Sequence, residues 1–446
     1  MTISQRPSQS LYDQHLDYVR SAFDAAMDRA GADTVVIFSG ALRYHFLDDS
    51  SYPFRSNPHF MYWLPVTDLP SSYVVYRRDQ KPVLLYYQPA DYWHSVAGDP
   101  DPYWANHFDV RPISTIDEAR AALPDGLKAP ILLGEIQDPN EALGIERTNP
   151  SAALHSLDIS RITKTDYELE RMRQASRLGA VAHRAAAHAF HNVTSSEYEI
   201  HQAYLESIRV IDSELPYNSI VGLNEHAAVL HYQHRARQAP SERRSFLIDA
   251  GANDAGYASD ITRTYSAVEG DFADLILAMD TLQQSLCGEV KEGKHYPDLH
   301  VEMHEALAQV VVNVGLSTAS PEELVEKGIT RALLPHGLGH YLGLQVHDVG
   351  GHLQDAKGTP TKRPERDPNL RLTRTLGNNE VVTIEPGLYF IDMLLTPIRT
   401  SGNRHLLNWT MVDELTPFGG IRIEDNVRVN GQTPENFTRD AFSAIK

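Results

Sequence analysis

The sequence predicts a mixed helix and strand protein of the α+β class, with two domains at residues 1–160 and 161–446. Two observations indicate this architecture. Helical and strand-like segments alternate through the first domain, which is typical of a small α/β unit. The second domain has several helices and then strand-like segments in its final third, which favours helices gathered around a curved antiparallel sheet.

The first domain begins with a helical spacing of apolar residues from Leu11 to Ala30, followed by Gly31 and the apolar strand Thr34–Phe38. Further strands are expected at 73–76, 83–87 and 131–134. This domain is rich in aromatic side chains, which we expect in the core or at a subunit interface: Tyr52, Phe54, Phe60, Tyr62, Trp63, Tyr92, Trp93 and Trp104.

The second domain is expected to start with a long helix that Thr165 caps, because Glu168 stands three residues on as in a capping box. The helices that follow are predicted at about 196–211, 272–288 and 299–314, and the strands at 381–385 and 421–429. The polar, proline-containing segment 354–371 is predicted to be a long loop, and loops of that length are often functional.

A β-hairpin is predicted from Phe246 to Tyr265, because two apolar segments flank a loop rich in glycine and aspartate. With the loop centred near Asp254 and Ala255, Asp249 and Asp260 would face each other. Their Cβ atoms would lie roughly 5 Å apart. Two carboxylates at that spacing raise each other's pKa unless a cation lies between them, so the hairpin indicates a metal site.

The bulk composition narrows the class of partner and the compartment. The net charge is −19 and no long Lys/Arg block occurs, which argues against nucleic acid and anionic membranes as partners. No stretch reaches the ~18 to 20 apolar residues of a membrane helix, and the first residues lack the apolar core of a signal peptide. The single cysteine, Cys287, allows neither an internal disulfide nor a thiolate metal site. A cytoplasmic protein is expected.

Other candidate ligands occur in three further motifs of the second domain. They are His336, His340 and His347 within 335–351, Glu385 before Pro386-Gly387, and Glu424 close to Arg422. Glycines and Leu338 between His336 and His340 exclude the helical H-E-x-x-H zinc motif and indicate a tight turn instead.

Each of these residues, taken alone, has a plain structural alternative. A lone histidine of this motif fits a structural role. Glu385 would be costly to bury without a partner, but a solvated strand end is equally open. Strand alternation puts Arg422 and Glu424 on one face, where an ordinary ion pair is the alternative.

Taken together, these carboxylates and one histidine indicate a metal site more strongly than any of them does alone. The four carboxylates carry four negative charges, which balance two divalent cations, and such oxygen-rich ligation with one imidazole favours Mn²⁺, with Co²⁺ or Zn²⁺ as substitutes. Two metals roughly 3.5 Å apart can hold and activate a bridging water. Hydrolysis at a carbonyl or phosphoryl centre is therefore the expected reaction class.

In this order the motifs resemble the pita-bread metallopeptidases, which include methionine aminopeptidase, aminopeptidase P, prolidase and creatinase. The likeness runs from about Ile162 to the end of the chain. The histidine-glycine motif at 336–351 and the segment Phe46–Phe54 are most similar to bacterial prolidases, a group that includes organophosphorus acid anhydrolases. The resemblance implies a pita-bread catalytic domain at 161–446, and an N-terminal domain at 1–160 that forms a homodimer and the pocket edge.

The resemblance also implies residue roles. The metal ligands would be Asp249, Asp260, His340, Glu385 and Glu424, with Asp260 and Glu424 bridging the two cations. The catalytic side chains would be Glu385 as acid and base, with His336 and His347. The substrate-binding residues would be His231, Tyr217, His347, Arg371 and Arg422. Asp49 or Trp93 would reach the pocket from the partner subunit of a dimer.

The function implied is hydrolysis of Xaa-Pro and Xaa-hydroxyproline dipeptides by a metal-bridging hydroxide, with organophosphate triester hydrolysis as a side activity. Two alternatives stay open. One is aminopeptidase P, which removes the first residue of longer X-Pro peptides. The other is a non-catalytic pita-bread binding module, which the complete ligand set disfavours. The creatinase branch lacks the metal ligands and is disfavoured for the same reason.

Overall fold

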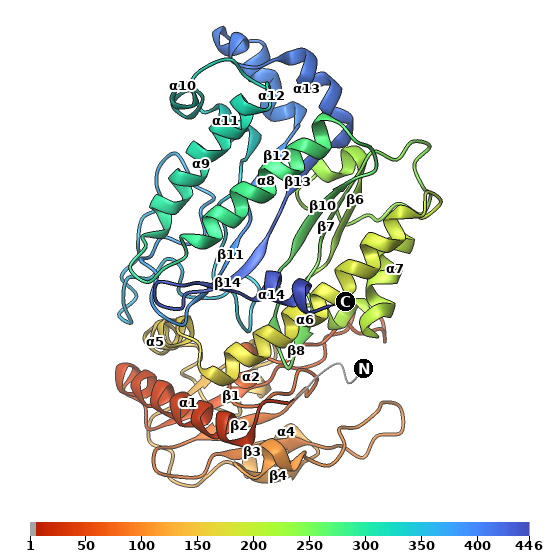
Figure 1. Cartoon of the computed structure of the whole chain (residues 1–446). Helices are drawn as coiled ribbons and strands as arrows, with labels where there is room; N and C mark the ends of the chain where they lie inside the picture. The colour runs from red at the N-terminus through yellow and green to blue at the C-terminus, as the bar shows by residue number, and fades with distance from the viewer. Residues whose placement is uncertain (1–5, 446) are drawn as a thin grey trace. The chain divides into compact units, whose positions relative to one another are not determined.

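The computed structural model describes residues 6–445 of the chain. The prediction that the first residues form no signal peptide concerns a segment that lies mostly outside this range. Contacts divide the chain into two compact units (Figure 1). One comprises residues 6–171 and 353–360, and the other comprises 172–352 and the chain from Thr361 on. The division falls within the long helix α6 (Asp166–His191).

The N-terminal unit is built on a mixed sheet with strand order β4-β3-β2-β1-β5. Its strands are β1 (Thr34–Phe38), β2 (Tyr73–Tyr76), β3 (Val83–Tyr87), β4 (Asp109–Ile113) and β5 (Pro130–Leu133). Strand β1 is antiparallel to β2 and parallel to β5, while β3 is antiparallel to β2 and parallel to β4. The predicted α/β character and the predicted strands are confirmed.

The helices of this unit begin with α1 (Gln9–Ala30), which starts two residues before the prediction. Ser8 Oγ accepts from Leu11 N at its start, and Gly31, at φ 59°, ends it in the left-handed conformation. Helix α1 lies beside α5, as Figure 1 shows. The other helices are α2 (Pro58–Met61), α3 (Pro102–Ala105), α4 (Ile116–Ala121) and α5 (Ser151–Ile162).

The predicted aromatic residues of this unit include buried and exposed side chains, and Phe54 is half-buried between these extremes. Phe60, Tyr62, Trp63 and Trp104 are buried in its core, as expected for packing. Tyr52, Tyr92 and Trp93 are exposed, Trp93 to 77%. These exposed rings lie on loops outside the sheet.

Helix α6 starts with the predicted capping box, because Thr165 N donates to Glu168 Oε2 at 2.9 Å and Glu168 N donates to Thr165 Oγ1 at 3.4 Å. The C-terminal unit continues with a series of helices that agrees with the predicted one within a few residues at most ends. These helices are α7 (Glu197–Ile208), α8 (Asp271–Gly288), α9 (Tyr296–Asn313), α10 (Pro321–Glu326), α11 (Ile329–Leu333), α12 (Asp392–Arg399), α13 (Trp409–Leu415) and α14 (Phe437–Ala444).

The strands of the C-terminal unit pair only antiparallel among the described residues, in the orders β10-β7-β6, β11-β14-β15, β12-β13 and β8-β9. They are β6 (Ile220–Leu223), β7 (Ser245–Asp249), β8 (Asn253–Asp254), β9 (Tyr257–Ala258), β10 (Thr262–Ser266), β11 (Val381–Ile384), β12 (Gly387–Tyr389), β13 (Gly420–Arg422), β14 (Asp425–Arg428) and β15 (Glu435–Asn436). Helices and antiparallel strands give the predicted α+β class.

One predicted strand is wrong as a single element. The segment 421–429 forms two strands, since β13 pairs with β12 and β14 pairs with β11. The break falls at Ile423 and Glu424, where an isolated bridge joins Glu424 to Thr262 of the neighbouring sheet. Ile421, Ile423 and Val427 keep one apolar register on both sides of the break, interrupted only at Asp425, so sequence periodicity gives little sign of it.

Helices cover the strands of this unit on one side (Figure 1). Helices α8 and α9 lie side by side, and α8 contacts β10, β11 and β13. A core of Phe190, Ile200, Tyr204, Phe246 and Ile248 joins α6 and α7 to β6 and β7. Within residues 6–445, no helix combines the length and the apolar character that crossing a bilayer requires.

Candidate metal centre

The predicted hairpin is present, but its register differs from the expected one. Strand β7 pairs with β10 so that Asp249 faces Thr262, and the tip pairs Asp254 with Tyr257. The turn therefore centres on Ala255 and Gly256, whose φ values are 52° and 96°. Two successive residues with positive φ form the type of turn whose twist matches that of the flanking strands. This explains why the turn lies at Ala255 and Gly256.

The shifted register still brings Asp249 and Asp260 to one side of the hairpin. Asp260 lies two residues before Thr262, so it lies diagonally across from Asp249 on the same face. The Tyr217 hydroxyl joins the two, at 2.8 Å from Asp249 Oδ1 and 2.5 Å from Asp260 Oδ1. Tyr204 supports the hairpin from α7 by donating to Gly251 O at 2.9 Å.

His340 is held with one ring nitrogen directed at these carboxylates. Its Nδ1 lies 2.8 Å from Tyr341 O, which can only accept, so Nδ1 carries a proton and Nε2 is the nitrogen that faces the carboxylates. Nε2 lies 3.4 Å from Asp260 Oδ2 and 3.9 Å from Glu385 Oε1. Main-chain pairing with Thr383, at 2.9 Å between Thr383 N and His340 O, fixes the segment against β11.

Glu385 and Glu424 are positioned by strands of the C-terminal unit. Glu385 follows β11, and its N donates to Leu338 O at 2.8 Å, which places it beside the glycine-rich turn. Glu424 occupies the break between β13 and β14, where its Oε2 accepts from Thr262 Oγ1 at 2.6 Å. Asp260, His340 and Glu424 each offer one ligating atom, and all three atoms lie within 4.8 Å of one another.

The electrostatics of the centre are those of crowded anions. Burial, reinforced by Asp260 and Glu385, raises the pKa of Glu424 well above its ordinary value. Burial likewise raises the pKa of Glu385 to about 7, although His340 and Arg422 oppose the shift. Burial lowers the pKa of His340, but Asp260 and Glu385 outweigh it and raise that pKa overall.

These residues fit divalent cations. Buried carboxylates with raised pKa values are unfavourable without positive charge, and a free imidazole Nε2 beside them completes a mixed oxygen and nitrogen donor set. Arg422 supplies part of that charge, since its Nη2 lies 2.7 Å from Asp249 Oδ2. One guanidinium leaves the remaining carboxylates without a partner of opposite charge, apart from His340.

Each of the predicted catalytic histidines lies next to a residue of this centre. His336 Nε2 lies 2.8 Å from the Tyr389 hydroxyl, and its Nδ1 lies 3.6 Å from Glu385 Oε2. Burial, with Arg422, lowers the pKa of His336 to about 3, so the ring is neutral. His347 is exposed and stacks edge-on against His340, with ring centroids 4.4 Å apart.

The predicted substrate residues separate into exposed and buried ones. His231 and Arg371 are exposed, and Arg371 contributes, after burial and His340, to lowering the pKa of His347 to about 4. Arg422 is buried and its guanidinium is used inside the site, with Nη1 at 2.8 Å from the Tyr389 hydroxyl. Tyr217 is half-buried between the two aspartates.

Sequence reasoning missed two polar residues of the centre. Thr262 contacts both Glu424 and Arg422, through Oγ1 at 2.6 Å and 3.3 Å. Strand alternation from Asp260 places Thr262 on the same face, so period-2 counting was sufficient to find it. Tyr389 joins His336 to Arg422, a link that depends on the β12–β13 pairing and has no local sequence signal.

Comparison with known proteins agrees with this fold and identifies the class of protein as a metallopeptidase. The family model of metallopeptidase family M24 matches residues 170–431. The family model of the Xaa-Pro dipeptidase N-terminal domain matches residues 10–159. The chain belongs to metallopeptidase family M24.

Its relatives include an Xaa-Pro dipeptidase of Shewanella pealeana, 46% identical over 430 residues that cover 96% of this chain and 98% of the relative. The Xaa-Pro dipeptidase of Shewanella oneidensis is 46% identical over 429 residues, with coverage of 96% and 98%. The predicted likeness to bacterial prolidases is confirmed.

Solved structures share the fold at lower identity. A zinc-substituted Escherichia coli aminopeptidase P with product superposes with a TM-score of 0.72 at 21% identity, covering 98% of this chain and 96% of that one. A proline aminopeptidase P II from Yersinia pestis gives a TM-score of 0.69 at 22% identity, with coverage of 98% and 97%. The pita-bread fold predicted for the C-terminal domain is thus confirmed.

Proposed function

We propose that this chain is an Xaa-Pro dipeptidase that uses two divalent cations, with Mn²⁺ as the native metal and Co²⁺ or Zn²⁺ as substitutes. The observation that carries the proposal is the convergence of Asp260, His340 and Glu424 within 4.8 Å, with Asp249 and Glu385 beside them. Relatives named Xaa-Pro dipeptidase at 46% identity over nearly the whole chain support the substrate class.

In this proposal Asp249, Asp260, His340, Glu385 and Glu424 hold the cations. Bound there, the cations would supply Lewis acidity toward the scissile carbonyl and activation of water. Glu385 lies between His336 and the ligand His340, with oxygens 3.6 Å and 3.9 Å from their nitrogens. Its carboxylate is therefore placed to take a proton from water and return it to the leaving imino nitrogen of proline.

Substrate recognition is assigned to the exposed cationic side of the centre. An Xaa-Pro amide has no N–H, so the free carboxylate of the dipeptide is its strongest handle. Arg371 is exposed close to His347 and offers a fork that donates two parallel hydrogen bonds to a carboxylate. His231 and His347 would border the same end, while Arg422 and Tyr217 would orient Asp249 and Asp260.

The N-terminal unit would serve dimerisation and the pocket edge. Its exposed apolar side chains support an interface with a second copy, because Phe46 and Leu47 are exposed to 91% and 90% and Trp93 to 77%. In such a homodimer, Asp49 or Trp93 would reach the pocket of the partner. A cytoplasmic location is proposed with it, in keeping with a single unpaired cysteine.

The ligand assignment is tested by Asp260→Asn. We expect release of proline from Ala-Pro to be abolished at saturating Mn²⁺, together with loss of bound metal by elemental analysis. Asp158→Asn, outside the centre, is the control and should keep both. Full activity in Asp260→Asn would remove Asp260 from the centre.

The carboxylate role of Arg371 is tested by Arg371→Ala. The KM for Ala-Pro should rise much more than that for its C-terminal amide, because only the free dipeptide carries the terminal charge. Lys362→Ala, an exposed cation of the same loop, is the matched control and should change neither constant. An equal rise for acid and amide would assign the terminal carboxylate to another residue.

The second candidate is aminopeptidase P, favoured by the fold likeness to two solved aminopeptidases. Comparing Ala-Pro with Ala-Pro-Ala-Ala separates the two, since a dipeptidase cleaves only the first. A phosphotriester assay on the same preparations measures the side activity. A protein that binds no divalent ion and cleaves neither peptide would instead be a binding module.

A further inference from the structure

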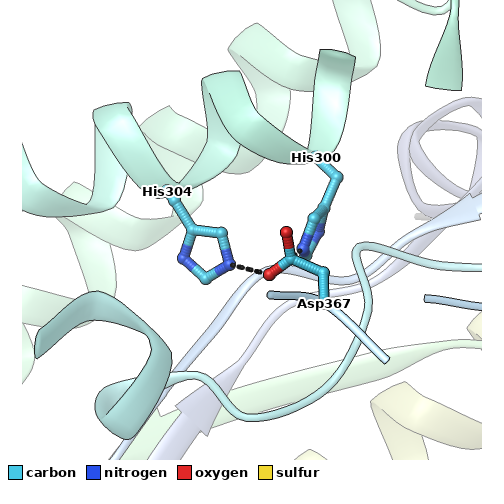
Figure 2. A group of neighbouring side chains, drawn as sticks. All are labelled: His300, His304 and Asp367. Atoms are coloured by element: carbon cyan, nitrogen blue, oxygen red, sulfur yellow. Dashed lines mark ion pairs between the residues drawn. The ribbon is translucent and has the colours of Figure 1, made fainter. Parts of the chain in front are cut away.

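A second group of ligating side chains lies buried outside the carboxylate centre (Figure 2). His300 and His304 stand four residues apart on α9 and so project from the same helix face. Asp367 comes from the loop that leads to Arg371 and faces both rings (Figure 2). The exposed fractions are 1%, 1% and 8%, so all three side chains are withdrawn from water.

The spacing of the ligating atoms suits a tetrahedral cation. His300 Nε2 lies 3.3 Å from Asp367 Oδ1, and His304 Nε2 lies 3.9 Å from the same oxygen. Ligands bonded at about 2.0 to 2.1 Å in a tetrahedron stand roughly 3.3 to 3.4 Å from one another. His300 Nε2 is thus at a coordination separation from Asp367 Oδ1, His304 Nε2 lies somewhat beyond it, and all three ligating atoms lie within 4.8 Å of one another.

The hydrogen-bonding state of the rings also indicates a ligand. Neither ring nitrogen of His300 makes a hydrogen bond of good geometry, and Nε2 meets the Asp367 carboxylate only as an ion pair at 3.3 Å. His304 Nδ1 is without a partner as well. Buried polar atoms in native proteins are usually paired, and three of the unpaired ones among the described residues belong to these two rings.

The protonation states agree with ligation. Burial, with the neighbouring His300 and Arg331, lowers the pKa of His304 to about 3, so its ring is neutral and keeps a lone pair. Burial favours the neutral acid at Asp367, but His300 and Arg331 outweigh it and hold that pKa well below its ordinary value. A neutral imidazole and an ionised carboxylate are the forms that bind metals.

Arg331 acts on this cluster in two opposite ways. Its Nε donates to Asp367 Oδ1 at 2.7 Å and its Nη2 donates to Oδ2 at 3.0 Å, which fixes the plane of the carboxylate. The same guanidinium competes with any cation for the negative charge of Asp367. Removing Arg331 should therefore strengthen cation binding, whereas removing Asp367 should weaken it.

We propose that His300, His304 and Asp367 form a further binding site for a borderline divalent cation such as Zn²⁺, distinct from the carboxylate centre. Two imidazoles and one carboxylate are the donor set that Zn²⁺ takes in many proteins, with water as the fourth ligand. The proposal does not rest on peptidase activity.

The position of the site gives it a structural effect. Asp367 O accepts from Leu370 N at 3.2 Å, and Asn369 Nδ2 donates to Pro335 O at 2.9 Å. The cation would therefore tie α9 to the segment that precedes Arg371 and contacts the chain before His336. Loss of the cation would loosen that segment without removing a ligand of the main centre.

The test counts zinc ions by calorimetric titration of chelator-stripped full-length protein. His304→Gln and Asp367→Asn should each lose one equivalent of bound Zn²⁺ relative to the parent chain. His188→Gln, an exposed histidine of α6, should lose none. Arg331→Gln should retain the equivalent and bind it at least tenfold more tightly, an effect that a purely structural ion pair would not produce.

A second measurement decides the matter if a variant fails to fold. In the Asp260→Asn/Glu424→Gln protein loaded with one equivalent of Zn²⁺, anomalous diffraction at the zinc edge should show a peak between His300, His304 and Asp367. Equal zinc counts in the parent and in folded His304→Gln, or no anomalous peak at this position, would overturn the proposal.

Discussion

Glu197 holds the segment that carries His231 by hydrogen bonds, and replacing it by glutamine should weaken that attachment. Glu197 lies in the first turn of α7, is exposed to only 1%, and accepts four hydrogen bonds through its two carboxylate oxygens. The donors flank His231 on both sides: Leu223 N at 2.8 Å, His226 Nδ1 at 2.7 Å, the Tyr232 hydroxyl at 2.8 Å and Ala236 N at 2.6 Å.

The cost follows from the donors that glutamine cannot serve. Its oxygen can replace Oε1, but its NH₂ group would face the Tyr232 hydroxyl and Ala236 N in place of Oε2. The hydroxyl can rotate and accept, whereas the amide N–H of Ala236 cannot. One buried donor is left unpaired and the charge of the acceptor is lost, which together cost about 3 kcal/mol.

The expected fall in melting temperature can be worked out from chain size. Unfolding entropy is about 2.1 cal/mol/K per residue, so a 446-residue chain unfolding as one unit has roughly 0.9 kcal/mol/K. The 3 kcal/mol loss then lowers the Tm by about 3 °C, and by about 5 °C if the C-terminal unit unfolds alone. Urea titration gives the free energy of unfolding directly, from the midpoint at constant slope.

The control is Glu206→Gln on the same helix, whose side chain is exposed. It should leave stability within about 0.5 kcal/mol of the parent. A loss below about 1 kcal/mol for Glu197→Gln, no larger than an ordinary surface bond, would refute the anchoring role.

Three further outcomes are expected. Gly251→Ala should destabilise the chain by about 1 to 3 kcal/mol, because its Cβ would collide with Ser259 O, whereas Gly288→Ala, with open space around it, should not; equal urea midpoints would contradict the close approach. Burial raises the pKa of Glu435, but two arginines outweigh it and lower that pKa, so its stabilisation is present at neutral pH and fades as pH falls below 4.5. The Tm of Glu435→Gln should therefore vary less with pH on the acid side, and parallel Tm curves would exclude the effect. Cys287, exposed to 5% and with a pKa that burial raises well above its ordinary value, should resist thiol reagents until the chain unfolds, and rapid labelling of native protein would show otherwise.

Local patterns were sufficient for most of the secondary structure. Strands such as Thr34–Phe38 and Val83–Tyr87 follow from continuous β-forming residues between turn signals. The helix that ends at Gly31 follows from apolar spacing and a left-handed stop. The break at Glu424 was not predictable in this way, because it depends on which sheet each half of the segment joins.

The metal centre, like the secondary structure, was predictable from local sequence patterns only in part. Its acidic and histidine residues could be singled out because each stands in an apolar or glycine-rich context that is costly for a charge. Their convergence, by contrast, depends on contacts between distant segments, such as Thr262 with Glu424. The contact of His300 with Asp367 gave no signal, since 67 residues separate them, and only the four-residue spacing of His300 and His304 was visible locally.

The hairpin turn at Ala255 and Gly256 limits how this chain can vary. Side chains alternate between the two faces of a strand, so the turn could move by one residue and still leave Asp249 and Asp260 on the same face. A single insertion or deletion between the two aspartates does not have this freedom: one of them would point away from the other. Viable loop lengths in this hairpin should therefore differ by even numbers of residues, unless a bulge absorbs the odd one.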